Sequence, residues 1–139
     1  ASYVAGRREG PSKVWHDNGQ LSEQGQCLSG KRHGAWLEWH PSGQRAASGG
    51  YVEGLREGPW LFWRSEFSIA TPEYDGLLKR GRFEGGKEEG TWTFWQENGH
   101  REKEGEFRQG LMEGKWVFWS TTGRIARIAS YRRGVLVER

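Results

Sequence analysis

The chain lacks the features that mark disulfide scaffolds and membrane-spanning proteins. One cysteine among 139 residues, Cys27, excludes a disulfide within the chain. Because Cys27 takes the place of a recurring aromatic residue, we interpret it as a buried structural thiol. No apolar run approaches the roughly 18 residues of a membrane-spanning helix, and no signal peptide is recognisable. The start at Ala1 suggests a trimmed or mature form, so the compartment stays open.

The sequence also lacks the short motifs that carry common enzyme chemistry. It contains no His-Glu-x-x-His, no Cys-x-x-Cys, no phosphate-binding P-loop and no Gly-x-Ser-x-Gly. His16 and His40 share a repeat position, but Arg64, Gln96 and Ser120 continue that row and supply no third metal ligand. We therefore expect no catalytic residues, no metal site and no cofactor.

Glycine and tryptophan are abundant, with 22 and 9 residues, and they form a repeated motif. Gly-x-Trp-x-x-Trp begins at Gly34, Gly58, Gly90 and Gly114, and a weaker copy begins at Gly10. The steps between these glycines are 24, 24, 32 and 24 residues, so one unit carries eight extra residues. A period of this size predicts a repeat array in which each unit buries its apolar surface against its neighbours.

Each unit has the pattern of a β-hairpin. The run 92–95 is rich in strand-forming residues, and alternation places Trp92 and Phe94 on one face and Thr93 and Trp95 on the other. Turn signals such as Asn-Gly at residues 18–19 separate consecutive strands. No window shows the apolar stripe of a helix. These patterns predict an all-β protein.

The cores of the units resemble the MORN repeat. The pattern Tyr/Phe-x-x-Gly-x-x-x-Gly-x-Trp occurs at residues 51–60 and 107–116, and its first part occurs at residues 3–10. The chain is most similar to the bacterial variant of the repeat (MORN_2), which is found in the YwqK-family antitoxin group. The resemblance implies a single elongated, twisted antiparallel sheet of successive β-hairpin repeats.

The repeat phase divides one domain into six parts. They are a partial repeat at 1–9 and repeats at 10–33, 34–57, 58–89, 90–113 and 114–139. Two positions depart from the pattern in the first repeat: Ser12 stands where the others have tryptophan, and Cys27 where the others have tyrosine or phenylalanine.

The tryptophans form two rows, which we interpret as the structural core of the repeats. The core candidates are Trp36, Trp39, Trp60, Trp63, Trp92, Trp95, Trp116 and Trp119. Large rings supply the apolar area that a single sheet otherwise lacks. The alternative is that one row stays partly exposed and forms an extended aromatic binding strip.

The insertion near residues 64–76 is the least repetitive segment, and it is the candidate partner-binding site. It offers Phe67, Ile69 and Tyr74 beside Pro72. Aromatic residues on loops of a regular scaffold favour recognition. The alternative is a hairpin whose strands simply run on and pack against each other.

The charge balance is mildly basic. The chain has 21 Lys and Arg against 18 Asp and Glu, a net charge of +3. Mixed signs within the turns are typical of solvated surfaces. The exception is a candidate basic patch near the end of the chain, formed by Arg124, Arg127, Arg132 and Arg133. The alternative is a polar cap on the last repeat.

We therefore expect a non-catalytic repeat scaffold that mediates protein–protein interaction. The resemblance to the YwqK group implies an antitoxin-like or immunity-like role, with a toxin or effector as the partner. MORN repeats are also linked to phospholipids, so the alternative is association with or tethering to an anionic membrane surface. Single-stranded nucleic acid is a less favoured ligand. Self-association through the sheet edges is a further expectation, because edge strands expose unpaired backbone.

Overall fold

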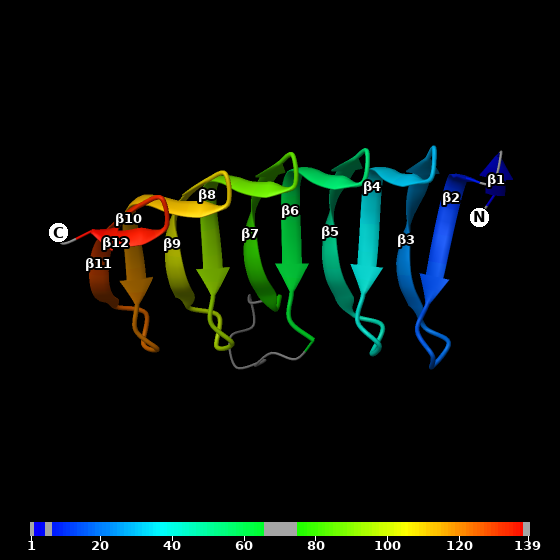
Figure 1. The fold of residues 1–139 in the computed structure, drawn as a ribbon. Helices are drawn as coiled ribbons and strands as arrows, with labels where there is room; N and C mark the ends of the chain where they lie inside the picture. The colour runs from blue at the N-terminus through cyan, green and yellow to red at the C-terminus, as the bar shows by residue number, and fades with distance from the viewer. Residues whose placement is uncertain (1, 5–6, 66–74, 138–139) are drawn as a thin grey trace.

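The computed structural model describes residues 2–4, 7–65 and 75–137, with side chains from residue 9 onward in those ranges. Twelve strands in these ranges form one antiparallel sheet in which every strand pairs with its neighbours in sequence (Figure 1). The strands are β1 Ser2–Val4, β2 Arg7–Trp15, β3 Leu21–Leu28, β4 Lys31–Trp39, β5 Arg45–Val52, β6 Leu55–Trp63, β7 Leu77–Glu84, β8 Lys87–Trp95, β9 Arg101–Arg108, β10 Leu111–Trp119, β11 Ile125–Arg132 and β12 Val135–Val137. The prediction of an all-β protein built as a single open sheet of hairpins is confirmed. Across the described ranges, no helix is long and apolar enough to cross a membrane.

Two kinds of turn alternate along the array. At one rim, turns such as residues 16–20 join β2 to β3, and at the other rim, turns such as residues 53–54 join β5 to β6. The second kind needs two successive residues in the left-handed conformation, as a tight hairpin does. Glu53 and Gly54 have φ of 49° and 84°, and Gly85 with Gly86 takes the same place in the long unit.

The anchor glycines bend the sheet. Gly58 has a φ of 79°, and the pairing of β5 with β6 is interrupted between Ser48 and Gly50 opposite it. A glycine at positive φ inside a strand is a typical device for a bulge and a bend. Figure 1 shows this bend: in every unit the upper end of the hairpin is turned away from the direction of its lower part.

The core lies on the inner side of this bend, where a tryptophan of each unit packs against the preceding unit. A Cβ atom added at Gly49 would lie 2.1 Å from the Trp60 ring, so the indole rests directly on the glycine backbone. Trp60 Nε1 donates a hydrogen bond of 2.9 Å to the Gly50 carbonyl oxygen. The same arrangement joins Trp36 to Gly25, Trp92 to Gly81 and Trp116 to Gly105. These four indoles are at most 1% exposed.

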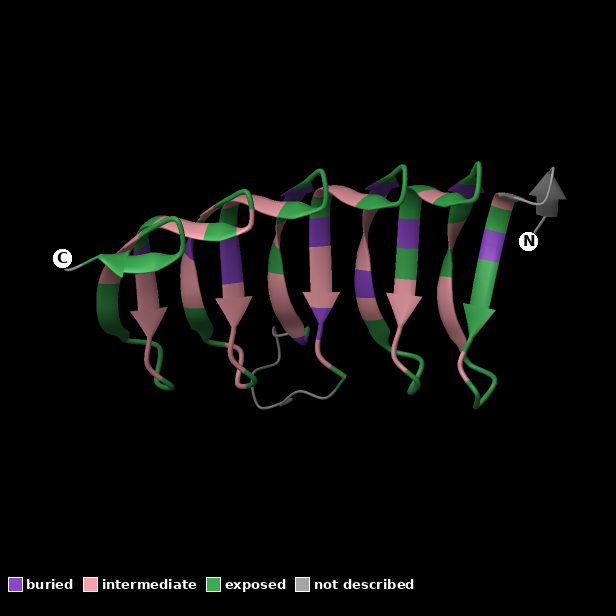
Figure 2. Cartoon of the chain, in the orientation of Figure 1, coloured by how far each residue is buried: buried purple, intermediate pink, exposed green. Residues whose placement is uncertain are grey.

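Further aromatic rings fill the spaces between these tryptophans. Tyr51 lies edge-on to Trp36 and Trp60, with ring centroids 6.0 and 5.3 Å apart. Phe83 meets Trp92 in the same manner at 5.1 Å. Edge-to-face packing is a favourable geometry for such rings. Figure 2 shows the buried positions recurring on successive strands, so the core runs along the array as a line of rings.

The first and last units differ from the internal ones at the positions of the packed tryptophan and glycine. Ala129 stands at the position of the internal glycines, and no tryptophan of a further unit lies over it in the described part of the chain. Ser12 stands at the tryptophan position of β2, whose only pairing with β1 covers Arg7–Glu9. Neither position therefore contains the indole-on-glycine contact that fixes both residues elsewhere.

Candidate interaction surface

The predicted partner-binding residues Phe67, Ile69, Pro72 and Tyr74 lie outside the described residues, so their role stays a prediction. The base of the insertion is described. Arg64 N donates to the Gly76 carbonyl oxygen at 2.8 Å, and Arg64 Nη2 donates to the Trp95 carbonyl oxygen of the next unit at 2.8 Å. The described ends of the insertion are therefore bonded to each other, and Arg64 is also bonded to the next unit.

The two tryptophan rows have different surroundings. The row of Trp36, Trp60, Trp92 and Trp116 is buried on what we call the inner face of the sheet. In the other row, Trp15 is 58% exposed, Trp63 is 7% exposed, and Trp39, Trp95 and Trp119 are partly buried. Guanidinium groups lie over several of these rings, with Arg45 at 4.7 Å from Trp63 and Arg101 at 4.9 Å from Trp119.

A row of alternating phenylalanines and cations crosses the inner face beside the buried tryptophans. It takes one side chain from each strand from β6 to β11, and each member pairs with the next across the strands. Its members are Phe62, Lys79, Phe94, Lys103, Phe118 and Arg127, which we call the Phe–Lys strip. The three phenylalanines are only partly buried, so the strip presents rings to solvent.

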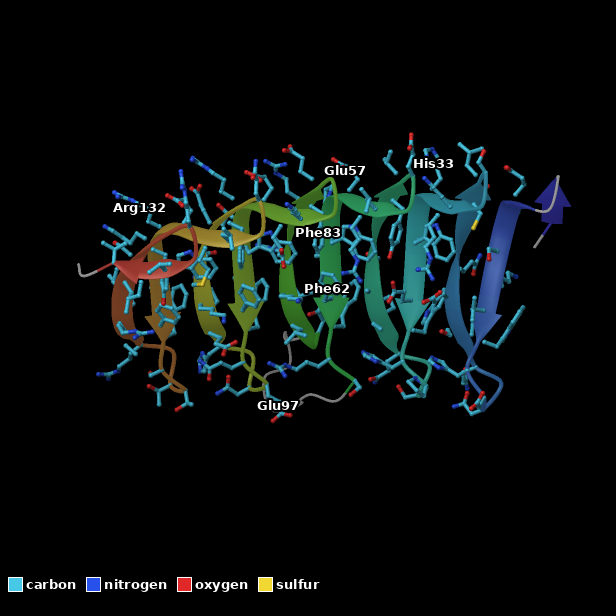
Figure 3. The ribbon with its side chains drawn as sticks, viewed as in Figure 1. His33, Glu57, Phe62, Phe83, Glu97 and Arg132 are labelled. Carbon is cyan, nitrogen blue, oxygen red and sulfur yellow. The ribbon has the colours of Figure 1, made fainter. Side chains whose placement is uncertain are left out.

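Contacts within the strip hold its side chains in place. Lys79 Nζ lies 4.9 Å from the Phe62 ring centroid, and Lys103 Nζ lies 4.9 Å from that of Phe94. The Arg127 guanidinium lies 4.5 Å from the Phe118 ring. These are cation–π distances. Behind the strip, Phe62 stacks on Trp60 at 5.6 Å, and Figure 3 shows Phe62 close to Phe83. The rings are therefore supported by the rigid core.

The same row changes character in the first two units. There it contains Glu23, Glu38 and Ala47, and Glu23 forms an ion pair with Arg32 at 2.5 Å. The row is thus acidic over β3 and β4 and basic from β7 onward. The strip was not predicted from the sequence, because only the tryptophans were compared from one unit to the next. Comparing the residue two places after each inner tryptophan would have revealed Phe62, Phe94 and Phe118.

The predicted basic patch is divided between three places. Arg132 and Arg133 line an open cavity of about 570 Å³ together with Lys87 and Arg108 from the preceding upper turns, and Glu113 adds one carboxylate to its lining. Arg127 belongs to the Phe–Lys strip, and Arg124 is exposed at a turn on the opposite rim. Sequence reasoning missed Lys87 and Arg108 because they come from earlier units, and only the stacking of the turns brings them beside Arg132.

The histidines that share a repeat position link neighbouring units. His16 Nε2 lies 2.8 Å from the Trp39 carbonyl oxygen, and His40 Nε2 lies 2.9 Å from that of Trp63. Since a carbonyl only accepts, this nitrogen is the donor in both rings. No group of three His, Cys, Asp or Glu side chains that could hold a metal ion occurs within the described ranges.

The recurrent glutamates before the anchor glycines also join units. Glu57 Oε1 accepts from the backbone N–H of Gly85 at 2.8 Å, and Glu89 and Glu113 make the equivalent bonds to Gln109 and Arg133 at 3.0 Å. The carboxylate therefore fastens each upper turn to the unit before it. These contacts give the recurrent glutamates a structural role in the array.

Removing one of these carboxylates will cause a modest loss of stability. We expect Glu57→Ala to lower the free energy of unfolding by about 1 kcal/mol, because the Gly85 amide loses a charged acceptor. Urea unfolding followed by tryptophan fluorescence measures the change. The matched control is Glu97→Ala, which removes an exposed carboxylate at the opposite rim (Figure 3). Equal effects of the two substitutions would contradict this role of Glu57.

Two segments of the chain match the family model described as a MORN repeat variant. They are residues 8–26 and 88–109, which cover most of the β2–β3 and β8–β9 hairpins. Both begin two residues before an anchor glycine, so they match the same part of the repeat. No curated protein matches the chain. In these two segments the chain is therefore similar to the MORN repeat variant, and its sheet of successive hairpins is consistent with such repeats.

Proposed function

We propose that this protein is a non-catalytic repeat scaffold that binds another protein. The observation that supports this is the Phe–Lys strip, in which partly exposed rings and cations recur at fixed spacing on a rigid sheet. Repeat proteins commonly present such extended surfaces to their partners. Aromatic and cationic side chains held by a packed core lose little conformational freedom on binding.

The resemblance to the YwqK antitoxin group supports a more specific form of this proposal. In that form the partner is a toxin or effector, and the scaffold acts by covering its functional surface. We propose the insertion at 64–76 as a second contact, and its described base, Arg64, follows Trp63 at the end of β6.

Capture of a partner tests the proposal directly. The chain is immobilised and exposed to lysate of its source cells at about 150 mM salt, where weak surface electrostatics are screened. Three forms are compared: the parent, a variant with residues 64–76 replaced by the short turn of residues 40–44, and Lys79→Glu/Lys103→Glu. We expect a protein that the parent retains and that at least one variant loses. Recovery of no protein by the parent would contradict the scaffold function.

A second candidate function is association with an anionic membrane surface. The observation that favours it is the cavity in which four cations, Lys87, Arg108, Arg132 and Arg133, outnumber the one carboxylate of Glu113, since clustered cations near a surface attract anionic lipids. Flotation with vesicles of phosphatidylcholine, with and without phosphatidylserine, separates the two functions. Phosphatidylserine-dependent binding that Arg132→Glu/Arg133→Glu abolishes would support the membrane function. The scaffold function predicts that this variant still retains the protein partner.

A further inference from the structure

We infer that the Phe–Lys strip binds an acidic segment in the polyproline II conformation, lying along the array and across the strands. This inference rests on the proposed function and specifies the chemistry of the partner. The strip combines the two properties that such a ligand requires, which are partly exposed rings at regular intervals and cations between them. The spacing of its rings, the positions of its cations and the strands over which it extends all favour this ligand.

The spacing of the rings matches the pitch of polyproline II. Phe62, Phe94 and Phe118 stand on alternate strands of the sheet, β6, β8 and β10. Adjacent strands lie about 4.8 Å apart, so the rings repeat every 9.6 Å or so. A polyproline II helix has three residues per turn and rises about 3.1 Å per residue, or about 9.3 Å per turn. Every third residue of such a segment therefore meets a ring.

Other regular conformations fit this spacing less well. Side chains on one face of an extended strand repeat about every 6.7 Å, and one turn of an α-helix rises about 5.4 Å. Over the five strand steps from β6 to β11, about 24 Å, both would lose register with the rings. Polyproline II is also preformed in proline-rich chains, and aromatic-lined surfaces are known to recognise it.

The cations determine the charge of the ligand. Lys79 and Lys103 stand on the strands between the rings, and Arg127 follows the last ring. Arg56 adds a guanidinium 5.3 Å from Phe62 at the other end. On β3 and β4 the same row contains Glu23 and Glu38 instead of cations, and Glu23 is ion-paired with Arg32. The site is therefore confined to β6–β11 and selects prolines followed by an acidic residue in each triplet.

Binding of defined peptides tests this inference. The probe is a fluorescein-labelled peptide of three Pro-Pro-Glu triplets, about 28 Å long in polyproline II. Two comparison peptides replace Glu by Lys or keep the composition and place all glutamates at one end. Fluorescence anisotropy is measured for the parent, Lys79→Glu, Lys103→Glu and Arg80→Glu. Arg80 neighbours Lys79 on β7 but lies over Trp95 on the opposite face, so it is a control of equal charge change.

We expect the regular Pro-Pro-Glu peptide to bind most tightly to the parent. Lys79→Glu and Lys103→Glu should each weaken it by about tenfold or more, and Arg80→Glu should have little effect. The double variant Lys79→Glu/Lys103→Glu should instead prefer the Pro-Pro-Lys peptide. Thermal unfolding of each variant near the temperature of the parent ensures that the fold is retained.

Three outcomes would overturn the inference. One is no binding of any peptide, and another is equal binding of the regular and rearranged peptides. The third is equal weakening by Arg80→Glu and Lys79→Glu, which would indicate non-specific attraction. Binding of an oligothymidylate or of phosphatidylserine vesicles that depends on Lys79, without peptide binding, would assign the strip to that ligand. The peptide assay and the capture of a partner are separate experiments. If the peptides do not bind but a protein partner is captured, only the inference about the ligand is refuted and the scaffold function is retained.

Discussion

Replacing Gly81 by alanine will lower the free energy of unfolding by about 3 kcal/mol or more. The new Cβ atom would lie 2.1 Å from Cδ2 of Trp92, a distance that no side-chain atom tolerates. Trp92 is 1% exposed and its ring is enclosed by Phe62, Phe83 and Phe107, so it has no free space into which to move. Overpacking of a filled core costs about 1–3 kcal/mol, and displacing the indole adds lost contacts.

Chemical denaturation of Gly81→Ala and of two control variants measures this effect. Gly58→Ala introduces a methyl group into open space at a φ of 79°, so it bears only a backbone cost of about 1–2 kcal/mol. Ala129→Gly removes a methyl group at the equivalent position of the last unit, and we expect a change below about 1 kcal/mol. If Gly81→Ala were no worse than Gly58→Ala, the indole-on-glycine contact would not be what joins the units.

Replacing Trp92 by alanine will have the second large effect, and it will also divide the unfolding transition. Loss of a buried tryptophan typically costs about 3–5 kcal/mol. Trp92 additionally carries the bond from Nε1 to the Arg82 carbonyl oxygen across the junction of β7 and β8. In an array where each unit contacts only its neighbours, a weakened junction uncouples the two sides. We therefore expect β1–β7 and β8–β12 to unfold separately.

Hydrogen exchange resolved by peptide is the measurement that detects this division. In the parent, protection on both sides of the junction should disappear together with denaturant. In Trp92→Ala, one side should lose protection at a lower concentration than the other. Trp15→Ala is the control, because Trp15 is 58% exposed and its removal should cost less than about 1 kcal/mol. A single cooperative transition of unchanged midpoint in Trp92→Ala would contradict the prediction.

Both predictions bear on function through the rigidity of the inner face. The Phe–Lys strip rests on the buried tryptophans, and Phe94 contacts both Trp92 and Trp116 at 6.3 Å. Disturbing Trp92 therefore removes support from the centre of the strip. A binding site made of partly exposed rings depends on this support, since a rigid site loses less conformational entropy when it binds.

Much of the fold could be predicted from the sequence. The period of the Gly-x-Trp-x-x-Trp motif indicated the number and order of the hairpins. The two-residue alternation of side chains indicated strands, and the glycines between them indicated turns. It also indicated that Trp92 and Phe94 share a face, as the contact between their rings shows. These features are local, since each depends on residues within one unit.

The surfaces depended on contacts that the sequence does not display. Phe62 and Lys79 are cross-strand partners only through the register of β6 and β7, since the insertion separates them in the sequence. Arg108 and Arg132 come from different units, and they share a cavity because successive upper turns stack. Reading each unit by itself could not reveal side chains that meet only between units.

The sequence by itself therefore determined the repeat, the all-β class and the order of strands, because propensity and periodicity act over a few residues. Only the tertiary structure decided which tryptophan row is buried. The bend at the anchor glycines encloses one row on the inner face, where each indole rests on a glycine of the preceding unit. It also decided that alanine is compatible with position 129, because in the described part of the chain no indole of a further unit packs on it as Trp92 packs on Gly81.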